Sequence, residues 1–212
     1  MIKTKRSSLK TFIREVLKEE SAVFHGYKFP PEKIGLPGPE FEDSEKVSKK
    51  DLESAKEWLK NNDPDELYAF SRGSAVLDQL FDEDPSFASK EIPKVTYVSP
   101  AALRKWTDSP VPNLPKGGKV IHSLGDNIVP IKQACKIASN AGIDMYVAPG
   151  KGDGKDHVRA LQYKSGEGTT KIDSTKCSTD EDLPDWGREG NASSEELEKQ
   201  IEIMKKYIDS KS

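Results

Sequence analysis

The sequence predicts an α/β fold, a three-layer sandwich in which a mostly parallel sheet of about five strands carries helices on both faces. Residues 118–157 carry the clearest pattern, because an apolar run, a helical pattern and a second apolar run follow one another with short loops. Strand, helix and strand in this order are typical of a parallel βαβ unit. Two runs upstream, 66–70 and 94–98, are rich in aromatic or β-branched residues and extend the same sheet.

Length and charge narrow the class of protein. The chain has 212 residues and a formal net charge of −3, which fits one domain of ordinary size. Its balanced charges give no basic field for nucleic acid. An uninterrupted apolar run of about eighteen residues, which a membrane span needs, is missing. We therefore expect a cytoplasmic protein that neither spans a membrane nor binds nucleic acid.

The two cysteines, Cys135 and Cys177, lie in a predicted helix and in a polar tail. Their positions follow no disulfide spacing pattern. This usage indicates a reducing compartment and predicts no disulfide framework.

Four segments organise the chain. Residues 1–20 predict an amphipathic leader or helix, 21–163 the α/β core, 164–192 a flexible polar loop, and 193–212 a C-terminal helix that packs on the core. The expected strands are 22–25, 66–70, 94–98, 118–122 and 143–148. The expected core helices start at Ser48, with Asp51 as its capping partner, at Ala75 and at about Pro130.

Three polar residues stand where chemistry is expected. Ser71 lies in a turn of small residues between a strand and a helix, which is typical of a nucleophile elbow. Asp126 and His157 each follow a strand, at the sheet edge where ligands bind. Acyl transfer needs a hydroxyl activated by an imidazole, and a carboxylate that orients the imidazole. We therefore expect Ser71 as nucleophile, His157 as general base and Asp126 as the orienting acid.

Each of these residues also has a plainer interpretation. Ser71 could cap the following helix, Asp126 could be an ordinary Gly-Asp turn residue, and His157 could be solvated in a loop. His25 and His122 lie at strand ends and are expected to be structural. The histidines show no spacing typical of metal ligands, so we expect neither a metal nor another cofactor.

The glycine-rich stretch 150–155 suggests a phosphate-binding loop at first sight. However, Pro149 stands where the first Walker glycine belongs, Asp156 replaces the Ser or Thr, and no clear helix follows. We interpret this stretch as a mobile loop that carries His157.

Four segments together resemble the α/β-hydrolase family. Residues 68–76 (YAFSRGSAV) resemble its nucleophile elbow, with Ala69 where its first glycine usually stands. Residues 120–130 (VIHSLGDNIVP) resemble its acid-bearing strand and loop. Residues 148–157 resemble the strand and loop that bring up the histidine, and residues 23–27 (VFHGY) resemble the His-Gly turn that leads into the oxyanion hole.

The resemblance implies a serine hydrolase that acts on ester, thioester or amide bonds of a small-molecule or acylated substrate. It implies an oxyanion hole formed by the backbone N–H groups of Arg72 and Tyr27, supported by His25, Gly26 and Gly73. The family's two opening strands and its lid have no counterpart here, so the resemblance implies a small, trimmed, lidless member.

Two other functions stay open on the sequence. The chain could be an inactive hydrolase-fold protein that serves as a binding or structural module. It could also be a Rossmann-like module that binds a phosphorylated ligand at the start of the helix after Ser71.

Residues 8–15 (SLKTFIRE) resemble the leaders of proteins packaged in the heads of large tailed phages. The maturation protease of those phages cuts after an aliphatic-x-Glu pattern, which residues 13–15 and 17–19 match. The resemblance implies a phage-encoded protein that is packaged through residues 1–20 and lies in the host cytoplasm or the virion.

Overall fold

The computed structural model describes residues 21–26, 30–44, 46–89, 94–101, 118–152 and 155–179, together with single positions of a C-terminal helix at 195, 199, 202 and 206. Within these residues six strands form one sheet in the order β1-β2-β3-β4-β5-β6. The strands are β1 (Ser21–Phe24), β2 (Glu66–Phe70), β3 (Lys94–Val98), β4 (Lys119–Ser123), β5 (Asp144–Ala148) and β6 (Thr170–Ile172). β1 to β5 are parallel and β6 is antiparallel to β5. The predicted α/β class with a mostly parallel sheet is confirmed.

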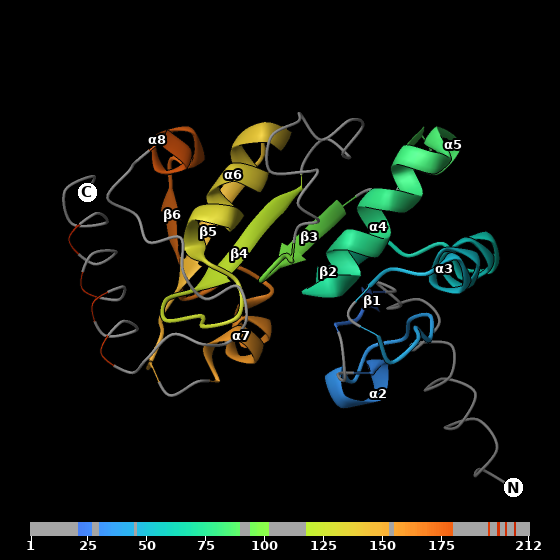
Figure 1. Cartoon of the computed structure of the whole chain (residues 1–212), viewed down its shortest axis with the longest axis horizontal. Coiled ribbons are helices and arrows are strands. Elements are labelled where there is room, and N and C mark those ends of the chain that lie inside the picture. Colours follow the sequence, from blue (N-terminus) through green and yellow to red (C-terminus); the bar gives the residue numbers. More distant parts are fainter. Residues whose placement is uncertain are drawn as a thin grey trace, which may run out of the picture.

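Helices cover both faces of the sheet (Figure 1). They are α2 (Pro31–Ile34), α3 (Lys49–Asn61), α4 (Arg72–Glu83), α5 (Pro85–Ser89), α6 (Ile131–Ala141), α7 (Asp156–Arg159), the 3₁₀ helix η2 (Ala160–Tyr163) and α8 (Ser174–Thr179). The strands alternate between two clusters, as a pleated sheet buried on both faces requires. In β2, Leu67 and Ala69 join the large cluster under α3, α4 and α6, whereas Tyr68 and Phe70 join a smaller one with residues of α2, α7 and η2.

The predicted bounds of the strands and the predicted cap at Ser48 are largely confirmed. β2 and β3 coincide with the predicted ranges, and the other three predicted strands shift by about one residue at an end. Ser48 caps α3, because its hydroxyl accepts a hydrogen bond from the Asp51 amide at 3.2 Å. The Asp51 carboxylate in turn accepts from the Ser48 amide at 2.7 Å, which completes a capping box.

The segment after residue 163 differs from the prediction. β6 and α8 lie within the range 164–192 that was expected to be a flexible polar loop, so the sheet extends beyond the predicted core boundary. β6 pairs with β5, where Ile172 lies opposite Met145. The sequence missed β6 because a three-residue edge strand with one buried side chain shows no alternation to detect.

The expectation of no disulfide is also wrong. Cys135 is fully buried on α6 and is disulfide-bonded. The chain's other cysteine, at position 177, falls within α8, and α8 packs against α6. No spacing pattern signals this bond, because the two helices are about forty residues apart along the chain and meet only through the tertiary fold.

The two terminal predictions fall largely outside the described residues. The leader 1–20 lies outside them altogether. In the C-terminal segment the four described positions are helical and exposed, while the predicted apolar stripe is outside them. No helix in the described ranges is long and apolar enough to cross a membrane.

Candidate active site

Ser71 lies in a sharp turn between β2 and α4. Its backbone has φ 51° and ψ −122°, a region that residues other than glycine rarely adopt. Three backbone hydrogen bonds hold this conformation: the Ser71 amide donates to the Val98 carbonyl at 3.0 Å, and the Ser71 carbonyl accepts from the amides of Ser74 and Ala101 at 3.0 and 3.1 Å. The side chain makes no capping bond to α4. The plain capping interpretation therefore does not describe its hydroxyl.

His157 lies in the first turn of α7, not in a mobile loop as expected. The Asp156 carboxylate accepts hydrogen bonds from the amides of Lys151 and Gly152 at 2.9 and 2.7 Å and pairs with Arg159. These contacts tie the start of the glycine-rich stretch to α7. The His157 carbonyl also accepts a hydrogen bond from the Ser99 hydroxyl at 3.2 Å. The imidazole is therefore carried by an anchored helix, and the His157 side chain is only 6% exposed.

The structure brings Ser71, His157 and Asp126 into one hydrogen-bonded series. His157 Nε2 lies 2.8 Å from Ser71 Oγ, and His157 Nδ1 lies 2.9 Å from Asp126 Oδ2. An ionised carboxylate can only accept, so Nδ1 carries the proton and donates it to Asp126. Nε2 is then free to accept the hydrogen bond of the Ser71 hydroxyl.

Asp126 is fully buried in the turn after β4. Its second oxygen, Oδ1, accepts hydrogen bonds from the amides of Ile128 and Val129 at 2.9 and 3.0 Å. Burial alone would raise the pKa of Asp126, but the nearby His157, with smaller contributions from His122 and the Val129 amide, lowers it to about 2. The carboxylate is therefore charged at neutral pH.

His122, on β4, lies on the other side of this carboxylate. Its ring is fully buried, neither ring nitrogen has a hydrogen-bond partner, and Nε2 is 3.9 Å from Asp126 Oδ2. Burial lowers the pKa of His122, although Asp126 opposes this, so the ring is neutral at pH 7. His122 therefore does not compete as a cation with His157 for the Asp126 carboxylate.

The end of β1 packs directly against the Ser71 turn. A Cβ built on Gly26 would lie 2.9 Å from Ser71 Cβ, and one on Gly73 would lie 1.9 Å from the Phe24 carbonyl oxygen. Only glycines allow the two segments to approach this closely. The predicted oxyanion donors are thus placed in part: Arg72 begins α4 next to Ser71, whereas Tyr27 lies outside the described residues.

His25 follows β1 and is hydrogen-bonded at both ring nitrogens. Its Nδ1 donates to the Gly26 carbonyl at 2.8 Å, and its Nε2 accepts from the Phe41 amide at 3.1 Å. Burial lowers the pKa of His25, and Arg72 lowers it further. Both nitrogens of this neutral ring are hydrogen-bonded to backbone groups, which agrees with the expected structural role.

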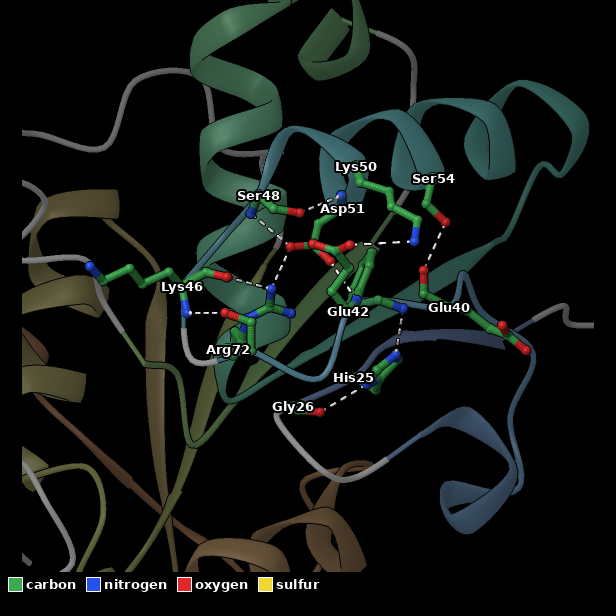
Figure 2. Close-up of polar contacts among 12 residues, drawn as sticks. His25, Gly26, Glu40, Glu42, Lys46, Ser48, Lys50, Asp51, Ser54 and Arg72 are labelled. Carbon is green, nitrogen blue, oxygen red and sulfur yellow. Dashed lines mark hydrogen bonds and ion pairs between the residues drawn. The ribbon is translucent and has the colours of Figure 1, made fainter.

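A buried ion pair behind Ser71 was not foreseen from the sequence. The Arg72 guanidinium pairs with the Asp51 carboxylate of α3 and donates to the Lys46 carbonyl at 2.7 Å (Figure 2). The side chains of Arg72 and Asp51 are 5% and 0% exposed. The sequence indicates only a helix-capping role for Asp51, because no sequence pattern links residues so far apart.

A cavity of about 390 Å³ lies beside α7, lined by Lys155, Val158, Arg159 and Gln162. Ser71, Asp126 and His157 are not among the residues that line it.

Chemically, the series can move a proton from a serine hydroxyl to an imidazole whose cation a buried carboxylate stabilises. In the described part of the chain, no group of three or more His, Cys, Asp or Glu side chains is arranged to hold a metal ion. No protein-family model, curated protein or solved structure matches this chain. Its chemistry is therefore inferred from the geometry alone.

Proposed function

We propose that this chain is a serine hydrolase of the α/β-hydrolase type, which transfers the acyl group of an ester, thioester or amide to water. The observation that carries the proposal is the hydrogen-bonded series from Ser71 through His157 to Asp126, with contacts of 2.8 and 2.9 Å. The strained strand-to-helix turn at Ser71 adds support, because it presents the hydroxyl at the end of β2. A solvated histidine or a capping serine would have no reason to adopt these contacts.

In the first half-reaction, Ser71 Oγ attacks the substrate carbonyl carbon while its proton passes to His157 Nε2. A bond forms between Oγ and the carbonyl carbon, and the carbonyl oxygen becomes an oxyanion. Asp126, charged at neutral pH, stabilises the imidazolium through Nδ1. His157 then protonates the leaving group, whose bond to carbon breaks, and leaves an acyl-serine. In the second half-reaction a water molecule attacks the acyl-serine carbonyl while its proton passes to His157. His157 then returns the proton to Ser71 Oγ as the ester bond breaks and the acid is released.

The oxyanion needs hydrogen-bond donors beside Ser71. The backbone N–H of Arg72 is the first of α4 and lies at the positive end of the helix. The N–H of Tyr27, which follows Gly26, is the second proposed donor. Removing one such donor typically costs about 3–4 kcal/mol of transition-state stabilisation. The substrate is accordingly proposed to be a small or acylated molecule whose carbonyl reaches the Ser71 turn.

The test is covalent labelling with a fluorophosphonate probe, which reacts with activated serines. We expect the wild-type protein to be labelled and to hydrolyse short p-nitrophenyl esters. Ser71→Ala should be unlabelled and inactive, because the nucleophile is gone, while circular dichroism shows an intact fold. The matched control is Ser86→Ala, which removes an exposed serine on α5 and should be labelled like the wild type. An unlabelled wild-type protein without esterase activity, or labelling that survives Ser71→Ala, contradicts the proposal.

A further inference from the structure

Asp51 is the centre of a partly buried hydrogen-bond network that includes the Arg72 guanidinium (Figure 2). Its carboxylate accepts hydrogen bonds from the amides of Ser48 and Glu42 at 2.7 and 2.8 Å and pairs with the Arg72 guanidinium. The network joins three parts of the chain: the start of α3, the segment before it, and the residue that follows Ser71. These contacts fix the side chain of Arg72, whose backbone forms the first residue of α4.

The same segment also reaches the other side of Ser71. The Phe41 amide, one residue before Glu42, donates to His25 Nε2, and His25 in turn donates to the Gly26 carbonyl. The Phe41 ring stacks on the His25 ring at 4.9 Å between centroids and lies under the Arg72 guanidinium at 6.0 Å. Two successive amides, those of Phe41 and Glu42, therefore link Gly26 on one side of Ser71 to Arg72 on the other.

The buried Asp51–Arg72 ion pair is not well built to stabilise the folded protein. Arg72 makes its two polar contacts through Nη2, while Nε and Nη1 are buried with no hydrogen-bond partner. Burying unpaired donors of a charged group is costly, and apolar side chains often replace buried ion pairs at no loss of stability. Burial raises the pKa of Asp51, but the Ser48 and Glu42 donors and Arg72 together bring it below its usual value, so the carboxylate is charged.

We propose that Asp51 is a positioning residue for the oxyanion hole, which acts by fixing Arg72 directly and Gly26 through the Phe41–Glu42 segment. The proposal rests on the proposed hydrolase function, because it assigns a task within that site. Asp51 touches neither the substrate nor Ser71. Its effect is to set where the backbone N–H of Arg72, directly after Ser71, points when the oxyanion forms.

The first measurement is steady-state hydrolysis of a p-nitrophenyl ester. Asp51→Ala should lower kcat roughly 10- to 100-fold, because displacements of about 1 Å at a reacting centre cost this much. KM should stay within about twofold, because the oxyanion donors act mainly in the transition state. Asp51→Asn should recover part of the loss, since its amide oxygen can still accept from the Glu42 amide.

The matched control is Ser54→Ala. The Ser54 hydroxyl donates to the Glu40 carbonyl at 2.9 Å, so it ties α3 to the same segment without touching Asp51 or Arg72. This variant should keep the wild-type kcat. An equal loss in Ser54→Ala would show that any anchor of the segment matters, and would overturn the specific role of Asp51.

The second measurement separates positioning from general damage. A thionoester, in which sulfur replaces the carbonyl oxygen, is a poor partner for oxyanion donors, so an intact hole favours the oxygen ester strongly. The ratio of kcat/KM for the oxygen ester to that for the thionoester should fall in Asp51→Ala by roughly tenfold or more. A merely structural defect lowers both rates together and leaves the ratio unchanged, which would overturn the proposal.

A folded variant is available even if Asp51→Ala unfolds. The pair Asp51→Leu with Arg72→Met replaces the ion pair by apolar side chains, a change that buried pairs often tolerate. It should keep the wild-type Tm or exceed it, and should show the reduced kcat and the reduced ester ratio. Wild-type kinetics in this variant would overturn the proposal.

Fluorophosphonate labelling distinguishes the two failures. A labelled wild-type protein whose Asp51→Ala variant reacts at the same rate contradicts the positioning role only. A wild-type protein that is not labelled at all contradicts the hydrolase function, and the positioning role with it.

Discussion

At the scale of single residues, Asp78 is a buried carboxyl group outside the Ser71 site. It lies on α4 and is 4% exposed, and it accepts a hydrogen bond from the Tyr97 hydroxyl at 2.9 Å. Burial raises the pKa of Asp78 to about 7, because the Tyr97 hydrogen bond offsets only part of the desolvation. The group is therefore protonated in the folded protein at pH values where the unfolded chain ionises it.

This difference predicts a stability that falls with rising pH. Between about pH 4 and 7 the folded protein binds more protons at Asp78 than the unfolded chain, so the free energy of unfolding decreases through this window. The loss is on the order of 4 kcal/mol once both states have ionised. Asp78→Asn stays neutral and should stabilise the protein at pH 8 but barely change it at pH 4. Chemical denaturation at both pH values measures this.

The control for this prediction is Asp82→Asn, which alters an exposed carboxylate on the same helix. It should leave the dependence of unfolding free energy on pH close to that of the wild type. An Asp78→Asn variant whose gain is equal at pH 4 and pH 8 would contradict the buried, protonated carboxyl group.

At the scale of elements, the first turn of α4 can pack closely against the end of β1 because Gly73 has no side chain. A methyl group there would meet the Phe24 carbonyl oxygen at 1.9 Å and the His25 carbonyl oxygen at 2.8 Å. Both obstacles are backbone atoms that cannot rotate away. The distance between α4 and the end of β1 therefore depends on this one glycine.

Gly73→Ala should lower the free energy of unfolding by about 3 kcal/mol or more, since overpacking a rigid contact forces the backbone apart. It should also abolish fluorophosphonate labelling under the proposed function, because Ser71 precedes this turn. Urea denaturation measures the first effect. Gly35→Ala is the matched control: nothing lies within 4 Å of its added Cβ, and its φ of 75° predicts a cost of only about 1–2 kcal/mol. Equal losses in the two variants would contradict the close approach.

Sequence patterns predicted the elements whose signals are local. The Ser48–Asp51 capping box and the β-branched run of β3 are examples, because each depends on residues that neighbour one another. The grouping of Ser71, Asp126 and His157 at one edge could also be predicted, since the carboxyl ends of parallel strands meet there. The Asp51–Arg72 pair could not, because only the packing of α3 beside α4 brings the two together. α7 was missed because a four-residue helix carries no periodicity.

At the scale of the whole molecule, the sheet order explains how the candidate site is assembled. Each strand from β2 to β6 lies beside the strand that precedes it in the chain. Ser71 follows β2, Asp126 follows β4 and His157 follows β5, so the three residues lie along one edge of four neighbouring strands. The turns that follow these strands bring the three side chains to within hydrogen-bonding distance of one another.

The disulfide at Cys135 bears on the environment in which this fold exists. We expect the native protein, unfolded without reductant, to contain no titratable thiol, whereas the same protein after reduction contains two. Reduction should lower the free energy of unfolding by about 2–4 kcal/mol, because it releases a constraint on the unfolded chain. Thiol titration and denaturation with and without dithiothreitol measure both effects. Two free thiols in the untreated protein would contradict the disulfide and favour a reducing compartment.

The backbone conformation of Ser71 creates a trade-off at this position between the stability of the fold and the proposed activity. A glycine would adopt φ 51° without strain, and strain of this kind is worth about 1–3 kcal/mol. Substitutions that raise heat resistance would therefore include loss of the hydroxyl itself. A laboratory evolution scheme that rewards survival on heating alone would drift toward a more durable protein that lacks the proposed nucleophile. Selection on this scaffold needs to reward labelling and durability together.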